Sequence, residues 1–165
     1  MMQIRGKRTS RSSALWADRG AVEIEFVLSI LTVLFTMFWM WEVVMAVYTY
    51  SVISDAAREG VRYAIVHGLK NQNCSGPVPT GFACPAGGTP DPSGAKVVAV
   101  VKDYASYSFH DISSISISNV SSMYPDGDNI SPHRVQVTVT YNFIPYTAFP
   151  FHPKLTATAQ GRIAN

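Results

Sequence analysis

The apolar positions gather in one long run near the N-terminus. No charged residue occurs from Phe26 to Trp41, and beyond Glu42 the run continues to Tyr48. These 23 residues would form a helix about 34 Å long at roughly 1.5 Å per residue, and a bilayer's hydrocarbon core is about 30 Å thick. A buried helix of a soluble protein is the alternative, but aromatic residues near the far end favour a membrane interface. We assign residues 21–48 to a transmembrane helix. The aromatic residues are Trp39, Trp41, Tyr48 and Tyr50.

The same helix is expected to continue beyond the membrane over residues 49–68. This stretch contains no proline until after Gly68, which is suited to cap a helix C-terminus. One helix would then run from about residue 22 to residue 67.

Small residues mark one face of this extension. Ala57, Gly60 and Ala64 lie close together on a helix, and Gly60 with Ala64 forms a small-x-x-x-small pair that permits close helix packing. Because glycine in a helix costs about 1 kcal/mol relative to alanine, Gly60 is expected to have a packing reason.

Charged residues alternate in sign on another face. Asp55 precedes Arg58 by three residues, and Glu59 precedes Arg62 by three. This spacing predicts a solvated face with internal ion pairs; docking against another protein is the alternative.

Residues 69–94 are rich in Gly, Pro, Asn and Ser and are predicted to form a loop. They include both cysteines of the chain, Cys74 and Cys84. In an exported, oxidising location these two would form a disulfide worth on the order of 3 kcal/mol in the chain-entropy description. Two cysteines at this spacing do not make a zinc site without further ligands.

The remaining residues, 95–165, predict one helix and three strands. Ser93 would cap a helix over residues 95–108, in which Val97, Val101 and Tyr104 recur at helical spacing. Strands are expected within residues 111–121, 134–144 and 154–162, where apolar and polar positions alternate. The clearest alternation places Val135, Val137, Val139, Tyr141 and Phe143 on one face. The fold class is therefore α+β, with a small three-stranded antiparallel sheet covered by the second helix and the extension of the first.

The distribution of basic residues predicts the orientation of the chain in the membrane. Of the 13 Lys and Arg residues, five lie in residues 1–20, opposed there only by Asp18, and the next basic residue is Arg58. The positive-inside rule then places the N-terminus in the cytoplasm and exports the C-terminal part. A cleavable secretory signal is disfavoured, because the run is long and ends in large side chains rather than at an A-x-A-like site. Nucleic-acid binding is not expected, since residues 21–165 carry 8 basic and 10 acidic residues.

Motifs for catalysis or cofactor binding are not evident. The four histidines lack partners at metal-ligand spacing, and residues 125–129, PDGDN, lack the distal glutamate of a calcium loop. No nucleophile elbow or phosphate loop occurs. We expect no enzyme, no metal, no cofactor and no small-molecule substrate.

Two motifs carry a family resemblance. The basic leader 1–20, then Gly20, "AVEI", Glu25 and Phe26 before the apolar run, resembles the processing site of type IV prepilins. "DAAREGVRYA" at residues 55–64 resembles the TadE-like pseudopilins of tight-adherence (Tad, or Flp) type IVb pilus systems. The likeness covers roughly residues 18–68, and Glu23 departs from the usual pattern. The motif residues are Ala56, Ala57, Arg58, Glu59, Gly60, Arg62 and Tyr63.

The resemblance implies specific roles. A prepilin peptidase would cut between Gly20 and Ala21, and Glu25, the fifth residue of the product, would neutralise the new ammonium of a neighbouring subunit. An unpaired charge in low dielectric would cost several kcal/mol, so pairing favours one axial register between subunits. An N-terminal glutamate could instead only favour the helix dipole, by about 0.3–1 kcal/mol. Glu42 would either reach out to headgroups or contact an assembly partner.

The expected protein is thus a pilin-like minor pseudopilin of the bacterial inner membrane. It would be single-pass, with other pilin subunits, the prepilin peptidase and the pilus export platform as partners, and would serve the assembly or priming of an adhesive pilus. The alternative is an uncleaved, membrane-anchored assembly factor or binding domain that never enters a fibre.

Overall fold

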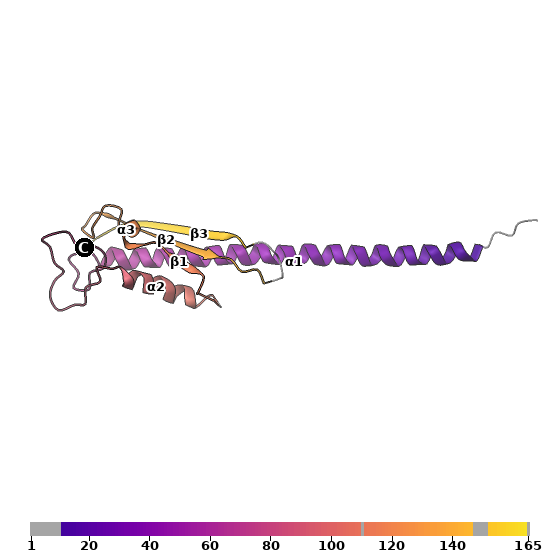
Figure 1. Cartoon of the computed structure of the whole chain (residues 1–165), viewed down its shortest axis with the longest axis horizontal. Helices are drawn as coiled ribbons and strands as arrows, with labels where there is room; N and C mark the ends of the chain where they lie inside the picture. The colour runs from indigo at the N-terminus through magenta and orange to yellow at the C-terminus, as the bar shows by residue number, and fades with distance from the viewer. Residues whose placement is uncertain (1–10, 110, 147–151, 165) are drawn as a thin grey trace, which may run out of the picture. The chain divides into compact units, whose positions relative to one another are not determined.

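The computed structural model describes residues 11–109, 111–146 and 152–164, with the backbone alone for residues 11–19. The elements confirm the α+β class and divide into two compact units, an N-terminal unit ending at Glu42 and a C-terminal unit beginning at Val43. In chain order the elements are α1 (Arg11–Val66), α2 (Ala95–Ser106), β1 (Ile115–Ile117), α3 (Val120–Met123), β2 (Arg134–Asn142) and β3 (Lys154–Arg162) (Figure 1).

Helix α1 is longer at its start than expected, and it ends at Val66 without the predicted cap. Gly68 does not adopt a left-handed conformation. The last carbonyl groups are instead satisfied by the loop that follows the helix and by the C-terminal end of the described chain. The Asn71 side chain donates to the Val66 carbonyl (2.8 Å), and the Ala164 backbone N–H donates to the Ile65 carbonyl (3.1 Å). A nearby side chain and one tertiary partner therefore replace the expected glycine cap.

Helix α2 is capped by Asp91, and the expectation that Ser93 would cap it was wrong. The Lys96 backbone N–H donates to Asp91 Oδ2 (2.6 Å), while the Ser93 hydroxyl donates to Asp91 Oδ1 (2.6 Å). Gly94 takes the left-handed conformation that turns the chain into the helix. The helix ends at Ser106, two residues before the expected Ser108, where a tighter turn closes.

The sheet is antiparallel with the order β1-β2-β3. β3 has the predicted bounds, and β2 lies within the predicted range, with Val137 opposite Ala159. The first strand is far shorter than expected, because only Ile115–Ile117 pairs with β2. The chain then turns into α3, where Met123 is fully buried.

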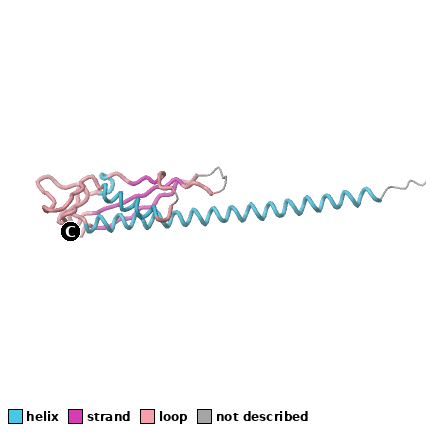
Figure 2. Tube along the Cα trace, turned by 90° about the horizontal axis from the view of Figure 1, so that it is seen from below, coloured by secondary structure: helices cyan, strands magenta, loops and turns pink. Residues whose placement is uncertain are grey.

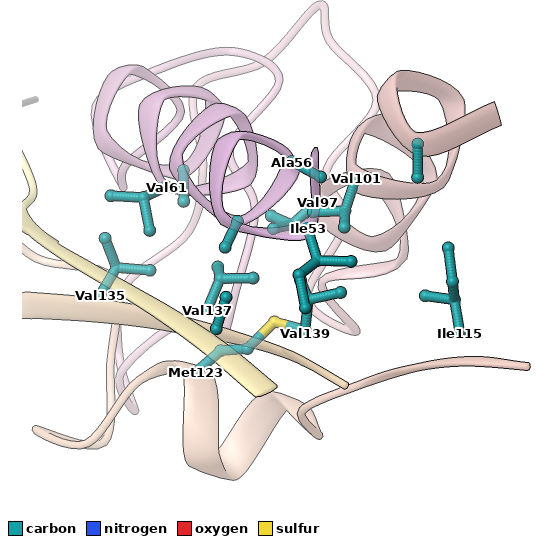
Figure 3. Packing of buried hydrophobic residues seen from close by; sticks show 14 of the residues in the cluster. Ile53, Ala56, Val61, Val97, Val101, Ile115, Met123, Val135, Val137 and Val139 are labelled. Carbon is teal, nitrogen blue, oxygen red and sulfur yellow. The ribbon is translucent and has the colours of Figure 1, made fainter. Parts of the chain in front are cut away.

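The core of the C-terminal unit lies on one face of the sheet. The inward side chains of β2 are buried as the alternation predicted, and they face α1 and α2 (Figure 3). Figure 2 shows the loop 69–94 at one end of this unit and the far ends of the strands at the other. The buried residues of the helices include Ile53, Ala56, Val61, Val97 and Val101.

Candidate assembly and processing site

Gly20 lies inside α1 and has no packing role in the described structure. A Cβ built at Gly20 would meet nothing within 4 Å, whereas one built at Gly60 would lie 2.4 Å from Val101 Cγ2. Glycine in a helix costs about 1 kcal/mol relative to alanine. The packing reason expected for Gly60 is therefore confirmed, and Gly20 needs a reason outside this chain's own packing.

Glu25 lies one turn beyond the expected cleavage point. Ala21 and Glu25 are both exposed and are four residues apart in α1, so they share a face of the helix. Glu23 is exposed as well but lies off that face. The other residues of the face are apolar or carry a hydroxyl: Ile24, Leu28, Ser29 and Thr32.

The apolar part of α1 is uncovered. Its large apolar side chains from Val22 to Trp41, Phe26 among them, are between 44% and 67% exposed. Within the described residues, one helix is long and apolar enough to cross a membrane, over Gly20–Val66. Aliphatic and aromatic surface of this extent needs lipid or protein around it, and this helix suggests a single-pass membrane anchor.

The hydroxyl groups within this apolar helix are satisfied by the helix itself. Ser29 donates to the Glu25 carbonyl, Thr32 to the Leu28 carbonyl, and Thr36 to the Val33 carbonyl, each at 2.8 Å. Such bonds remove the cost of placing a hydroxyl in hydrocarbon.

Glu42 differs from its neighbours in the apolar helix. Its side chain is 8% exposed, whereas Trp41 and Val43 are 55% and 45% exposed. The structure thus sets Glu42 apart from the exposed apolar surface around it, and both expected roles, contact with headgroups and contact with an assembly partner, stay predictions.

The residues of the family motif form a strip of α1 on which the rest of the C-terminal unit packs. Ala56, Ala57 and Ala64 are fully buried, and Val61 is 4% exposed. At Gly60 the strip contacts both α2, through Val101, and β2, through Val137. The small residues thus let a helix and a sheet approach α1 within one chain.

The charged face of the same motif points to solvent. Arg58 pairs with Asp55 (3.0 Å) and Arg62 with Glu59 (3.3 Å), which are the predicted pairs. All four side chains are at least 40% exposed, so each pair contributes only about 0–1 kcal/mol to stability. The remaining motif residue, Tyr63, stacks on His67 with ring centroids 3.9 Å apart.

Cys74 and Cys84 form the predicted disulfide, with Cα atoms 6.0 Å apart. A buried polar network that we did not predict ties this loop to the domain. Ser75 donates to Asp91 (3.3 Å), and the Ser75 carbonyl accepts hydrogen bonds from Tyr124 (3.0 Å) and Asn129 (3.2 Å). These partners lie up to 54 residues apart, and only the turn-forming "DPSG" at residues 91–94 marks the site in the sequence.

The carboxylates of the PDGDN turn have protein partners. Asp126 accepts from Arg134 (2.7 Å), and Asp128 contacts the imidazole of His133. The Arg134 guanidinium and backbone N–H hold the pKa of Asp126 at about 2, below its ordinary value of 3.8. The carboxylates of the turn therefore hold it against the start of β2.

Comparison with known proteins agrees with the geometry of α1. The model of the family described as "TadE-like protein" matches residues 20–62, which begin at the candidate processing glycine and end within the packing strip. No curated protein matches the chain. No solved structure matches it either. Over residues 20–62 the chain is therefore similar to the TadE-like family, which is consistent with a TadE-like protein of tight-adherence (Tad) pilus systems.

Proposed function

We propose that this protein is a minor pseudopilin that serves the assembly or priming of a tight-adherence pilus. In this proposal the helix α1 holds it in the inner membrane with residues 1–20 in the cytoplasm and the C-terminal unit exported. Its partners are a prepilin peptidase, other pilin and pseudopilin subunits and the pilus export platform. The role is structural, with no catalytic activity or cofactor, and supports adhesion to surfaces.

The observation that carries the proposal is the contrast between two glycines of one helix. Val101 packs against Gly60 and explains why that position lacks a side chain, whereas a Cβ built at Gly20 would meet none of the described atoms within 4 Å. A peptidase that must grip the backbone at this position supplies the missing reason. Glycine also lowers the cost of opening the helix there, since it is a weak helix former.

Glu25 supports the second part of the proposal. Cleavage after Gly20 would create an ammonium group at Ala21, on the face of α1 that carries Glu25. Once α1 packs among other subunits, that ammonium is costly unless a carboxylate compensates it. A neighbour's Glu25 compensates it in one axial register, which gives the carboxylate and Phe26 beside it a role in assembly.

One observation favours a second candidate function. Helix α1 continues without a break from Arg11 through Gly20, so the bond to be cut is helical in the full-length chain. An uncleaved anchor with an exported assembly or binding domain would keep this helix intact. Processing requires that the peptidase open the helix near Gly20.

N-terminal sequencing separates the two candidates. The protein would be isolated from membranes and from sheared surface material of cells with an active prepilin peptidase. We expect Ala21 at the N-terminus in both fractions. Recovery of the intact leader in membranes, together with absence from the sheared material, would establish the uncleaved anchor. A Gly20→Ala variant is a clean companion, because the structure has room for the added methyl group.

A further inference from the structure

The membrane-spanning run of α1 and the folded C-terminal unit overlap in sequence. The apolar run extends to Tyr48, yet the C-terminal unit begins at Val43. Within that unit Met45 and Ala46 pack against its core. Helix α1 is continuous through residues 43–48, so these residues belong both to the apolar run and to the C-terminal unit. With the end of the run at the membrane interface, part of this unit would lie at the level of the lipid headgroups.

The contacts of β2 show which part of the domain this is. β2 runs opposite to α1: Gly161, which pairs with Val135, lies against Val61 and Ile65, and Val137 lies beside Gly60. Ile144 comes seven residues after Val137, about 23 Å further at roughly 3.3 Å per strand residue. β2 ends at Asn142, two residues before Ile144. With an extended chain over these last residues, the distance equals about 15 residues of helix at 1.5 Å each, which would place Ile144 near the level of Met45. Figure 2 shows this end of the unit, opposite to the loop 69–94.

The side chains at this end are apolar or aromatic and exposed. Ile144 is 50% exposed and Tyr146 is 69% exposed, and they follow the buried Phe143 at the end of β2. The neighbouring turns of α1 add Val47, Tyr48 and Tyr50, at 49% to 60% exposure. The sequence carries no Asp, Glu, Lys or Arg from Val43 to Ser54 or from Phe143 to Pro153. Tyrosine and aliphatic side chains without charge are suited to the interface between headgroups and acyl chains.

We propose that the end of the C-terminal unit formed by Ile144 and Tyr146, together with Tyr48 and Tyr50 of α1, docks into the headgroup region of the bilayer that α1 crosses. The domain would rest on the membrane rather than stand above it. The energy for this comes from burying apolar surface, and the covalent link to the span makes the encounter intramolecular. Assembly into a fibre would have to detach this surface from the lipid. The proposal rests on the membrane-spanning part of the proposed function and not on cleavage or pilus entry.

Spin-label accessibility in the full chain tests this docking. With Cys74 and Cys84 paired, a nitroxide can be placed through single substitutions, Ile144→Cys and Tyr146→Cys, in vesicles of phosphatidylethanolamine and phosphatidylglycerol. Accessibility to oxygen, which concentrates in the bilayer, is compared with accessibility to a water-soluble nickel chelate. The matched control is Phe82→Cys, an aromatic residue 61% exposed in the loop at the opposite end of the unit. Val33→Cys marks the depth of the span.

The expected result is a shift of the labels at 144 and 146 toward oxygen, to values between those at 82 and 33. A second substitution, Ile144→Glu, should return the label at 146 to the value at 82. If labels at 144 and 146 match the one at 82 while the label at 33 is deep, the docking proposal fails and the membrane anchor stands. If the label at 33 is also accessible to the nickel chelate, the span and the docking fail together.

Discussion

The side chain of Val101 lies directly over the backbone of Gly60, where an added Cβ would approach Val101 Cγ2 to 2.4 Å. This contact joins α2 to α1 at the point where β2 also reaches the helix. We expect Gly60→Ala to destabilise the C-terminal unit by about 1–3 kcal/mol, because the valine must move within a packed core. Urea unfolding of the full chain in detergent, followed by near-UV circular dichroism, measures the change.

The matched control is Gly20→Ala, which adds the same methyl group to the same helix in open space. It should leave the unfolding free energy of the C-terminal unit unchanged while abolishing cleavage, and Gly60→Ala should still be cleaved. Equal losses of stability in the two variants would contradict the packing role of Gly60.

Glu25 and Glu23 offer a second matched pair. Both are exposed carboxylates on α1, but only Glu25 shares a face with Ala21. We expect Glu25→Gln to be cleaved and inserted normally but to lose surface piliation, since it can no longer neutralise a neighbour's ammonium. Electron microscopy and quantification of sheared pili give the readout. Normal piliation in Glu25→Gln, or an equal loss in Glu23→Gln, would refute the register role.

The disulfide is expected to stabilise the C-terminal unit. Replacing Cys74 and Cys84 together by serine should lower the unfolding free energy by about 3 kcal/mol, because the open loop gains entropy in the unfolded chain. Denaturant unfolding checks this, and a reductant added to the native protein should produce the same loss. If the reductant also destabilised the double variant, the effect would not come from this bond.

The pair of Asp126 and Arg134 predicts a loss of stability in acid. The folded-state pKa of Asp126, about 2, lies below the ordinary value of 3.8. Its contribution is therefore present above about pH 4 and is lost as the pH falls toward about 2. Asp126→Asn and Arg134→Gln should each flatten the decline of unfolding free energy over this range. A decline unchanged in both variants would exclude the pair as its cause.

Tyr124 predicts a loss of stability in alkali. Burial raises the pKa of its phenol to about 12 from an ordinary value of 10.0. Stability from this group is present below about pH 10 and is lost as the pH rises toward 12. In Tyr124→Phe this alkaline loss should disappear, at a cost of about 0.5–1.5 kcal/mol at neutral pH for the hydrogen bond to the Ser75 carbonyl. Tyr107→Phe, exposed at 83%, is the control for removing a hydroxyl at neutral pH.

Local patterns in the sequence predicted the parts of the fold that depend on local chemistry. The alternation from Val135 to Phe143 placed one face of β2 in the core, and the three-residue spacing of Asp55 and Arg58 predicted their ion pair. Local spacing did not predict that Asp91 caps α2. The position of Asp91 also depends on a hydrogen bond from Ser75, sixteen residues away in the chain. β1 is short and α3 follows it because tertiary burial of Met123 overrides the alternation of isoleucine and serine.

The candidate site, like the fold, was predicted from the sequence only in part. The positions of Gly20 and Glu25 came from a family resemblance, since neither residue has a distinctive local physical signal. The packing reason for Gly60 followed from helix propensity alone. The burial of Glu42 was not predicted from its place in the apolar run.

The three hydroxyls of the apolar helix, on Ser29, Thr32 and Thr36, donate their protons to carbonyls of their own helix. From Phe26 to Phe38 the helix surface thus offers a neighbour shape but no free hydroxyl donor to recognise. Selection of a partner helix along this stretch would rest on steric fit. The relative orientation and axial register of two such helices would be set by the charges at their N-terminal ends. In the proposed pilus, no side-chain hydroxyl along this stretch would hold the helix in a wrong axial position.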